Sequence, residues 1–380
     1  MTQQPKNQSQ PKDFISFFGM DIRDRKNYLQ GVEIDASLKD RFAKSTAYCR
    51  FFSLFNHLGD RAYQRIAQLP IGQDPLFILG YFRSGTTFLH TLLSKDPQFA
   101  FTTNYHAGFP HLVLWGQSFF KRLRSIGRPK ERADKMSIAL DLPQEEEQAI
   151  VGLTPYTFAL HEYFPQQWSH YLDRYTSFEE ATDAERNAFE QALIRVIRSS
   201  LVDCWGGGED GLKSKRFLSK SPAHSARIPM LLKLFPNAKF IYIARNPYFI
   251  YSSNITHFSS TFETLSFQRI SKEELSANVL ASYKKIIIDH YEQQKQLIPE
   301  GNLLEIRFED FVAHPLQQAE AIYERLNLPG WEQAQAAMQA YVEESRSYKP
   351  RTYPTFSSET IDLVNRHWGL AIERGGYTRL

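Results

Sequence analysis

The chain has 380 residues, with 45 lysines and arginines against 42 aspartates and glutamates, and a formal net charge of +3. This near-neutral balance argues against a dedicated nucleic-acid-binding protein, which usually carries a strong basic excess. A hydrophobic content of 42% and an aromatic content of 14% exclude disorder for most of the chain, because so much apolar surface can offset the entropy of ordering. The length corresponds to one large α/β domain or two ordinary ones.

The N-terminus and the two cysteines indicate the compartment. Residues 1–13 are polar and lack the apolar core of a signal peptide, and no window approaches the roughly 18 consecutive apolar residues of a membrane span. Cys49 and Cys204 lie far apart in sequence and cannot build a disulfide framework, which predicts a reducing compartment. We therefore expect a cytoplasmic protein with a disordered tail over 1–13, and peripheral membrane contact is left open.

An N-terminal helical extension is expected over residues 14–74, since apolar residues recur near helical spacing between 37 and 69. The apolar run 76–79 then predicts a strand, and the stripe Phe88, Leu89, Leu92 and Leu93 predicts the helix of a first βα unit. Residues 101–165 are weakly periodic, as lid-like or functional segments often are.

A long helix is expected from Asp183 to Trp205, where three glycines end it. Three further strands are expected at 217–220, 239–244 and 303–307, each followed by a helix, with Pro247 opening the helix after the second. Strands alternating with helices predict the α/β class: a mainly parallel central sheet flanked by helices.

The most informative segment runs from Gly80 to Thr87, between the first strand and its helix. Two glycines five residues apart, followed by hydroxyl residues, give the frame of a P-loop, a nucleotide-binding element. Backbone N–H groups of such a loop and the positive end of the next helix hold phosphate-like oxygens. The strand-before, helix-after context favours anion binding over an ordinary tight turn.

The differences from a nucleotide triphosphatase are also informative. Thr86 stands where such an enzyme has its lysine, and Arg83 supplies a positive charge from inside the loop. A Mg²⁺-dependent phosphoryl transferase also needs an acidic residue after a neighbouring strand. The strand 239–244 is followed by Arg245 instead, so the pattern predicts an anion site without a metal.

These motifs resemble the sulfotransferase family, most closely its bacterial and carbohydrate-type branches. The segment Phe82-Arg83-Ser84-Gly85-Thr86-Thr87 is similar to the family's phosphosulfate loop, with Phe82 in place of proline. Arg245 and Ser253 have the spacing of the family's 3′-phosphate pair, and further similarity lies at Lys220-Ser221-Pro222 and Arg307-Phe308-Glu309-Asp310-Phe311. Together the motifs span residues 75–315, within an expected sulfotransferase-like domain over 75–380.

The resemblance implies a sulfuryl donor, 3′-phosphoadenosine 5′-phosphosulfate (PAPS), with 3′-phosphoadenosine 5′-phosphate (PAP) as product and no metal. It implies in-line transfer to a hydroxyl or an amine of a small-molecule, carbohydrate or lipid acceptor. The donor is expected to contact Arg83, Ser84, Gly85, Thr86, Thr87, Arg245 and Ser253. Arg83 and Lys220 would stabilise charge during transfer. The segment from Tyr348 to Tyr353 is a further candidate for covering the adenosine.

The base that takes the acceptor's proton is left open among three residues. Glu145 and Glu147 lie in a segment that resembles a Pro-Gln-Glu-x-Glu motif of the bacterial branch, and they are preferred over His106. Pro143 is expected to start a helix there, and the helix dipole alone would favour carboxylates at that point. For His106, a buried hydrogen-bonded loop histidine is the plain alternative.

Aromatic residues between 99 and 175, Phe158 among them, are candidates for the acceptor pocket, although most such side chains are core. The basic stretch Lys121–Lys135 is a candidate for membrane or acidic-acceptor contact, or a solvated helix face. Two other functions are considered, a P-loop kinase or nucleotide phosphatase and a non-catalytic peripheral protein that keeps the fold. Stabilisation by PAP, by ATP–Mg²⁺ or by neither separates the three.

Overall fold

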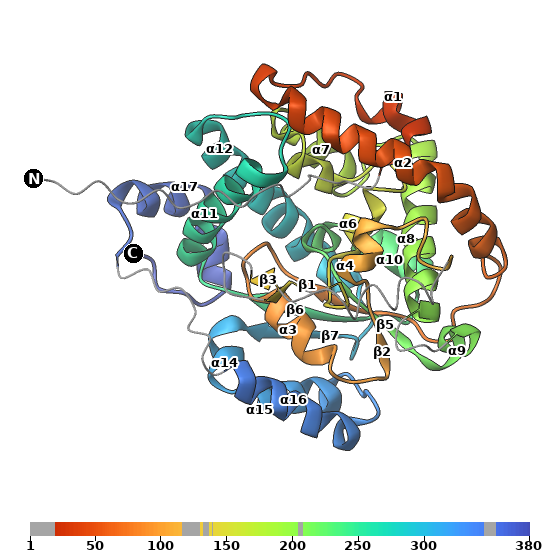
Figure 1. Cartoon of the computed structure of the whole chain (residues 1–380). Coiled ribbons are helices and arrows are strands. Elements are labelled where there is room, and N and C mark those ends of the chain that lie inside the picture. The colour runs from red at the N-terminus through yellow and green to blue at the C-terminus, as the bar shows by residue number, and fades with distance from the viewer. Residues whose placement is uncertain (1–19, 116–129, 132–136, 139, 204–207, 346–354) are drawn as a thin grey trace, which may run out of the picture.

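Five parallel strands form the central sheet in the order β2-β5-β1-β6-β7 (Figure 1). Their bounds in this computed structural model are β1 Leu76–Leu79, β2 Phe99–Ala100, β5 Arg216–Lys220, β6 Lys239–Ala244 and β7 Leu303–Arg307. A separate antiparallel pair joins β3 (Lys130–Glu131) to β4 (Ser137–Ile138). The structure describes residues 20–115, 130–131, 137–138, 140–203, 208–345 and 355–380.

The central strands are short apolar runs because both faces of the sheet are covered. All four residues of β1 are buried, as are the middle four of β6. Parallel strands covered on both faces have near-continuous apolar sequences of this kind. The mainly parallel sheet flanked by helices, predicted from the sequence, is confirmed.

One face of the sheet is covered by α3 (Thr86–Leu93) and, around it, α14 (Phe308–Ala313), α15 (Pro315–Arg325) and α16 (Trp331–Ser345) (Figure 1). The remaining helices gather on the other side. Those between β6 and the C-terminus are α11 (Pro247–Leu265), α12 (Lys272–Tyr283), the π-helix η8 (Lys284–Tyr291), α13 (Glu292–Gln294), η9 (Lys295–Leu297) and α17 (Ser358–Arg374).

The segments before β5 supply the rest of this second layer (Figure 1). The N-terminal helices are η1 (Ile22–Asp24), α1 (Arg25–Tyr28), η2 (Ala36–Leu38) and α2 (Lys39–Gln64). After β2 come α4 (Asn104–Gly108), α6 (Glu146–Ile150), η3 (Phe158–Glu162), η4 (Pro165–Gln167), α7 (Trp168–Tyr175), α8 (Asp183–Asp203), η6 (Gly208–Asp210) and α9 (Gly211–Ser214). Two short helices, η7 (Pro222–Ala226) and α10 (Ile228–Leu234), connect β5 to β6.

The prediction that a helix begins at Pro143 is wrong. Pro143 lies in an extended segment that forms an isolated antiparallel bridge with Thr103, and α6 begins three residues later at Glu146. The bridge holds the backbone extended up to Glu145, whose φ and ψ of −66° and 130° are also extended. Glu145 is therefore the residue at which the chain turns into α6.

Candidate active site

The carboxyl ends of adjacent strands bring the predicted cations together. Strand β1 has β5 on one side and β6 on the other, and the chain order reverses around it. Ile78 of β1 pairs with Lys220 of β5, and Leu79 pairs with Tyr242 of β6. The loop after β1 thus lies between Lys220 and Arg245. In open α/β sheets, ligands bind at this kind of switch point.

Two glycines give the loop its shape. Gly85 has a φ of +103°, and a Cβ added there would lie 2.2 Å from the ring of Phe308. Gly80 has a φ of +139°, and a Cβ there would lie 2.9 Å from the carbonyl oxygen of Ile243. Arg83 also has a positive φ, +66°, which is uncommon for a residue with a side chain. Such local strain is typical of a loop shaped for a ligand.

Hydrogen bonds from later segments fix this backbone. The Gly80 N–H donates to the Ser225 hydroxyl at 2.9 Å, and the Asn254 amide donates to the Phe82 carbonyl at 3.0 Å. The Arg245 guanidinium donates to the Arg83 carbonyl at 2.7 Å. The loop is therefore held in one conformation, as a preorganised anion site requires.

The side chains of Arg83 and Ser253 meet beside the loop. Arg83 Nε donates to Ser253 Oγ at 3.2 Å, and Ser253 lies in α11, after Arg245. The Arg245 guanidinium also lies over the Phe308 ring, 4.1 Å from its centroid. Arg83, Arg245 and Ser253, three of the seven residues expected to contact the donor, are thus joined by direct or shared contacts.

Thr86 and Thr87 open α3, so their N–H groups belong to the helix end that has no intrahelical partners. This end also carries the positive end of the helix dipole. Ser84 is different, because its hydroxyl donates to the Tyr81 carbonyl at 2.8 Å and closes the turn from inside. The anion-binding capacity of the loop therefore resides mainly in backbone N–H groups and cationic side chains.

Lys220 and Glu145 form an ion pair at the end of β5. The Lys220 ammonium lies 2.5 Å from a Glu145 oxygen, and the two side chains are 5% and 18% exposed. Glu145 makes no side-chain hydrogen bond to the start of α6. Its carboxylate therefore forms an ion pair with Lys220 and does not cap the helix.

The next two glutamates are buried and fully engaged. Glu146 accepts from the Ser219 hydroxyl and the Lys220 N–H, and its carboxylate lies 2.8 Å from His224 Nε2. Burial alone would raise the pKa of Glu146, but these partners outweigh it and hold the pKa below its usual value.

Glu147 makes a two-pronged ion pair with Arg227, with both N–O distances at 2.8 Å. It also accepts from Ser221 and Thr157, each at 2.7 Å. Burial alone would raise the pKa of Glu147, but the charge and hydrogen bonds of Arg227 outweigh it and lower the pKa to about 2. Sequence reasoning missed Arg227, although a lone arginine before the apolar run 228–232 was a usable signal.

His106 lies elsewhere, within α4, and its ring reaches Asp203 of α8. Its Nε2 lies 3.0 Å from an Asp203 oxygen, and its Nδ1 accepts from the Thr103 N–H at 3.2 Å as part of a capping box. The imidazole side chain is 2% exposed. Both ring nitrogens therefore have local structural partners.

A small pocket beside Glu145 combines aromatic and apolar groups with the polar side chains of Glu147, Gln148, Glu162 and Ser221. Its lining includes Phe82, Phe158, Ala159 and His161, together with Glu145. His161 was missed from the sequence. It stacks on Phe158 three residues earlier, at 4.2 Å, as residues i and i+3 of a 3₁₀-helix do. Burial lowers its pKa to about 4, and its Nε2 has no hydrogen-bond partner within the described part of the chain.

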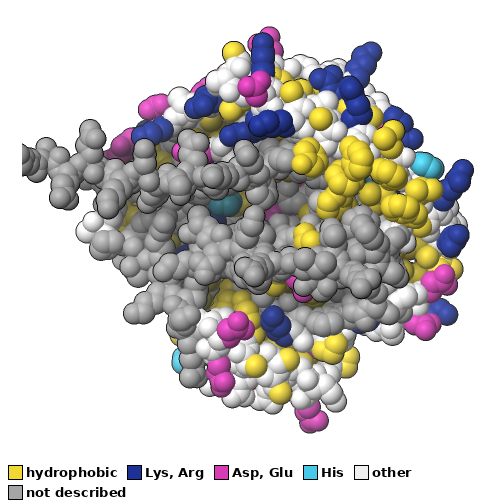
Figure 2. All heavy atoms as spheres, viewed as in Figure 1, with side chains coloured by type: hydrophobic (Ala, Val, Ile, Leu, Met, Phe, Trp, Pro, Cys, Tyr) yellow, Lys and Arg dark blue, Asp and Glu magenta, His cyan; other side chains and the backbone are white. Residues whose placement is uncertain are grey.

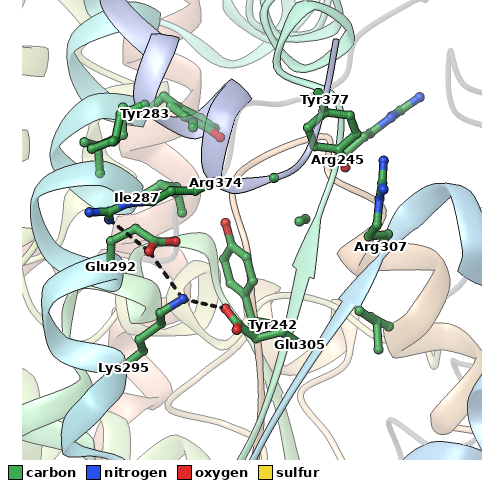
Figure 3. A pocket seen from close by; sticks show the side chains of 16 residues that line it. Tyr242, Arg245, Tyr283, Ile287, Glu292, Lys295, Glu305, Arg307, Arg374 and Tyr377 are labelled. Atoms are coloured by element: carbon green, nitrogen blue, oxygen red, sulfur yellow. Dashed lines mark hydrogen bonds and ion pairs between the residues drawn. The ribbon is translucent and has the colours of Figure 1, made fainter.

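A cavity of about 480 Å³ lies on the other side of Arg245, between β6, β7, η8 and the end of α17 (Figure 3). Arg374, Glu292, Lys295 and Glu305 form a chain of ion pairs along one wall, with N–O distances of 3.0–3.3 Å. Arg245 lies across the cavity from that wall and so borders both this space and the anion loop.

Residues 75–333 match the family model described as "Sulfotransferase family". A curated relative, omega-hydroxy-beta-dihydromenaquinone-9 sulfotransferase Stf3 of Mycobacterium bovis, is 30% identical over 322 residues, or 83% of this chain and 78% of the relative. The chain belongs to the sulfotransferase family. The implied donor, PAPS, is the family's donor, and this sulfotransferase is a PAPS-dependent transferase that acts on a small-molecule acceptor. This identification sets aside the kinase and the non-catalytic alternatives.

Two solved structures show the same fold at low sequence identity. Sulfotransferase STF9 from Mycobacterium avium has a TM-score of 0.68 and 16% identity, covering 97% of this chain and 99% of that one. Sulfotransferase STF1 from Mycobacterium tuberculosis has a TM-score of 0.63 and 18% identity, covering 93% and 94%. The sheet with its anion loop is therefore a sulfotransferase architecture.

Some sequence predictions fall outside the described residues. They concern the tail 1–13, Cys204, most of Lys121–Lys135 and the segment from Tyr348 to Tyr353. Within the described ranges, no helix combines the length and apolarity needed to cross a bilayer. Over the same ranges, no three His, Cys, Asp or Glu side chains are grouped to hold a metal ion.

Proposed function

We propose that Glu145 is the general base of this sulfotransferase and that Lys220 stabilises the charge that develops beside it. The observation that carries the proposal is the Lys220–Glu145 pair at the end of β5, next to the anion loop. A base must reach the acceptor hydroxyl. At 18% exposure Glu145 has that access, whereas Glu147 at 2% is enclosed by Arg227, Ser221 and Thr157.

For the donor, we propose two contact regions. The loop residues Arg83, Ser84, Gly85, Thr86 and Thr87 would hold the 5′-phosphosulfate through backbone N–H groups, hydroxyls and the Arg83 guanidinium. Arg245 and Ser253 would hold the 3′-phosphate, which a guanidinium can bind with two parallel hydrogen bonds. The contacts of Arg83 with both residues support a single, continuous donor site. PAPS supplies the sulfuryl group, and these residues orient it toward the pocket beside Glu145.

For the acceptor, we propose an apolar alcohol of the lipid class. Phe82, Phe158 and a neutral histidine line the pocket beside Glu145 together with polar groups such as Gln148 and Glu162, so the pocket offers an alcohol both apolar contact and hydrogen-bonding partners. The relative Stf3 is named for a hydroxylated menaquinone derivative, which is such a molecule.

We further propose that 75–380 is the catalytic domain and 14–74 its helical extension, in keeping with a family match that begins at residue 75. The cytoplasmic location and the lack of a nucleic-acid partner stay predictions.

A sulfate-transfer assay with radiolabelled PAPS tests the acceptor class. The panel contains polyprenyl alcohols, hydroxylated isoprenoid quinols, phenols, sugars and aliphatic amines. Turnover is expected with the hydroxylated isoprenoids and not with the sugars. Sulfation of sugars alone would overturn the lipid assignment. The Glu145→Gln variant tests the base separately, because it should lower turnover with whichever acceptor the wild type uses.

A further inference from the structure

Helix α2 buries mostly small and polar residues and exposes several large apolar ones. The side facing the protein carries Ser45, Cys49, Asn56 and Gly59, together with Phe42 near its start. At Gly59, an added Cβ would lie 1.7 Å from the carbonyl oxygen of His111, so this side of the helix lies against backbone. A surface helix usually turns its apolar stripe inward and its polar stripe to solvent. Between Ser45 and Gly59, α2 departs from this pattern, because large apolar side chains lie on its solvent side.

The solvent side carries Tyr48, Phe51 and Leu54 at intervals of three residues, with 43%, 57% and 65% of their surfaces exposed. Phe51 contacts Phe55, and Phe55 stacks on Trp115, which is itself 36% exposed. Among the described residues, seven large apolar side chains are exposed, and four of them belong to this cluster. Figure 2 shows apolar side chains gathered over α2 with lysines and arginines around them. We name Tyr48, Phe51, Leu54, Phe55 and Trp115 the α2 patch.

The charged rim of the α2 patch is mostly positive. The exposed charges on α2 are Lys39, Lys44, Arg50 and Arg61 against Asp40. The other acidic residue of the helix, Asp60, is paired with Arg195 at 2.7 Å and with His111 at 3.1 Å. An apolar centre with a cationic rim complements a bilayer surface that contains anionic lipids, because the aromatic and aliphatic groups enter the interface while the cations meet headgroups.

A second copy of the chain fits this surface less well. A two-fold symmetric contact places the same patch against itself, so the Lys44 and Arg50 side chains of both copies would gather at one interface. Like charges at such distances weaken association. The charge pattern thus favours a negatively charged partner over self-association.

We propose that the α2 patch docks this sulfotransferase on membranes containing anionic lipids. The proposal concerns a surface remote in sequence from the loop and from Glu145, and it does not depend on which acceptor is sulfated. It would place the enzyme at the phase in which an apolar acceptor is concentrated.

Vesicle sedimentation with the full chain tests this. The vesicles contain phosphatidylcholine alone or mixed with phosphatidylglycerol, and the test variant is Phe51→Ser with Leu54→Ser. The control is Leu297→Ser with Leu380→Ser, two leucines that are 52% and 54% exposed elsewhere on the surface. We expect binding to mixed vesicles, weakened by salt, with the partition coefficient falling at least about tenfold in the test variant and unchanged in the control. Both variants should keep the stabilisation by PAP, which shows that they are folded.

A third variant separates charge from apolar contact. Lys44→Gln with Arg50→Gln should weaken binding to mixed vesicles while leaving the weak binding to neutral vesicles unchanged. Equal sedimentation of test and control variants would overturn the proposal. So would a wild-type dimer, seen by sedimentation velocity, that ignores vesicles and dissociates when Phe51 and Leu54 are replaced.

Discussion

Replacing Glu147 by glutamine should lower the stability of the protein, whereas replacing Glu145 should lower its turnover. Glu147 is held by two 2.8 Å bonds from Arg227, a side chain with no exposed surface. Removing its charge leaves a buried guanidinium without its counter-charge, which typically costs about 3–5 kcal/mol. The lowered pKa gives the same scale, since a fall from 4.5 to about 2 corresponds to about 3 kcal/mol.

Thermal unfolding measures this loss. With an unfolding entropy of about 2.1 cal/mol/K per residue, a loss of this size should lower the Tm of Glu147→Gln by about 4–6 °C near neutral pH. The sign of the pH dependence is fixed, because a carboxyl whose folded pKa is depressed stabilises above its unfolded pKa. The Glu147 contribution is therefore complete above about pH 4.5 and disappears toward pH 2. The two Tm values should converge over that range.

Glu145→Gln keeps an amide oxygen that can accept from Lys220, and this pair is partly open to solvent on the Glu145 side, at 18% exposure, so its Tm should fall less than that of Glu147→Gln. Its kcat at saturating donor should fall about 100- to 10,000-fold, the usual contribution of a positioned base. An unchanged kcat in this variant would refute the assignment of the base. An unchanged Tm in Glu147→Gln would refute the structural role of the Arg227 pair.

Three further variants test the donor loop and the acceptor wall. Arg245→Lys keeps the charge but loses the planar fork, so PAP binding measured by calorimetry should weaken about 10- to 100-fold, with Arg307→Lys as the control that stays near wild type. Gly85→Ala should abolish PAP binding, because the new methyl group meets the Phe308 ring and φ is +103°; adding Phe308→Ala relieves only the contact, so full recovery would contradict the backbone argument. In the wild type, His161 should make the Tm fall between pH 6.5 and 4, because its unfolded form gains a proton over that range while the buried folded form, with a pKa of about 4, does not. His161→Phe should therefore make the Tm depend less on pH over that range. An unchanged slope would show that other groups cause the fall in Tm.

The strands and the anion loop could be predicted because their signals are local. Strands β1 and β6 have the predicted bounds, since a strand buried on both faces is a continuous apolar run. The start of helix α8 at Asp183 was also predicted from the sequence. Strand β2 was not, because two residues carry too little pattern and its pairing with β5 depends on residues more than a hundred positions later.

Roles that depend on distant partners could not be read from the sequence. Periodicity located helix α2 but gave no indication that Phe51 and Leu54 face solvent, since the spacing of a stripe does not say which side meets the core. Likewise, Glu145 and Glu147 have similar sequence surroundings. Their difference comes from Lys220 and Arg227, 75 and 80 residues away.

The three consecutive glutamates have distinct roles that depend on one another. Glu146 and Glu147 bind the segment from Ser219 to Arg227, and this fixes the start of α6 against the end of β5. Because two buried carboxylates already set the position of the helix, the Glu145 carboxylate does not anchor α6 and is available to pair with Lys220 at the edge of the pocket. Protonating Glu147 would instead leave the buried Arg227 without its counter-charge. The proposed roles, Glu145 as base and Glu147 as structural anchor, therefore follow from the positions of Lys220 and Arg227.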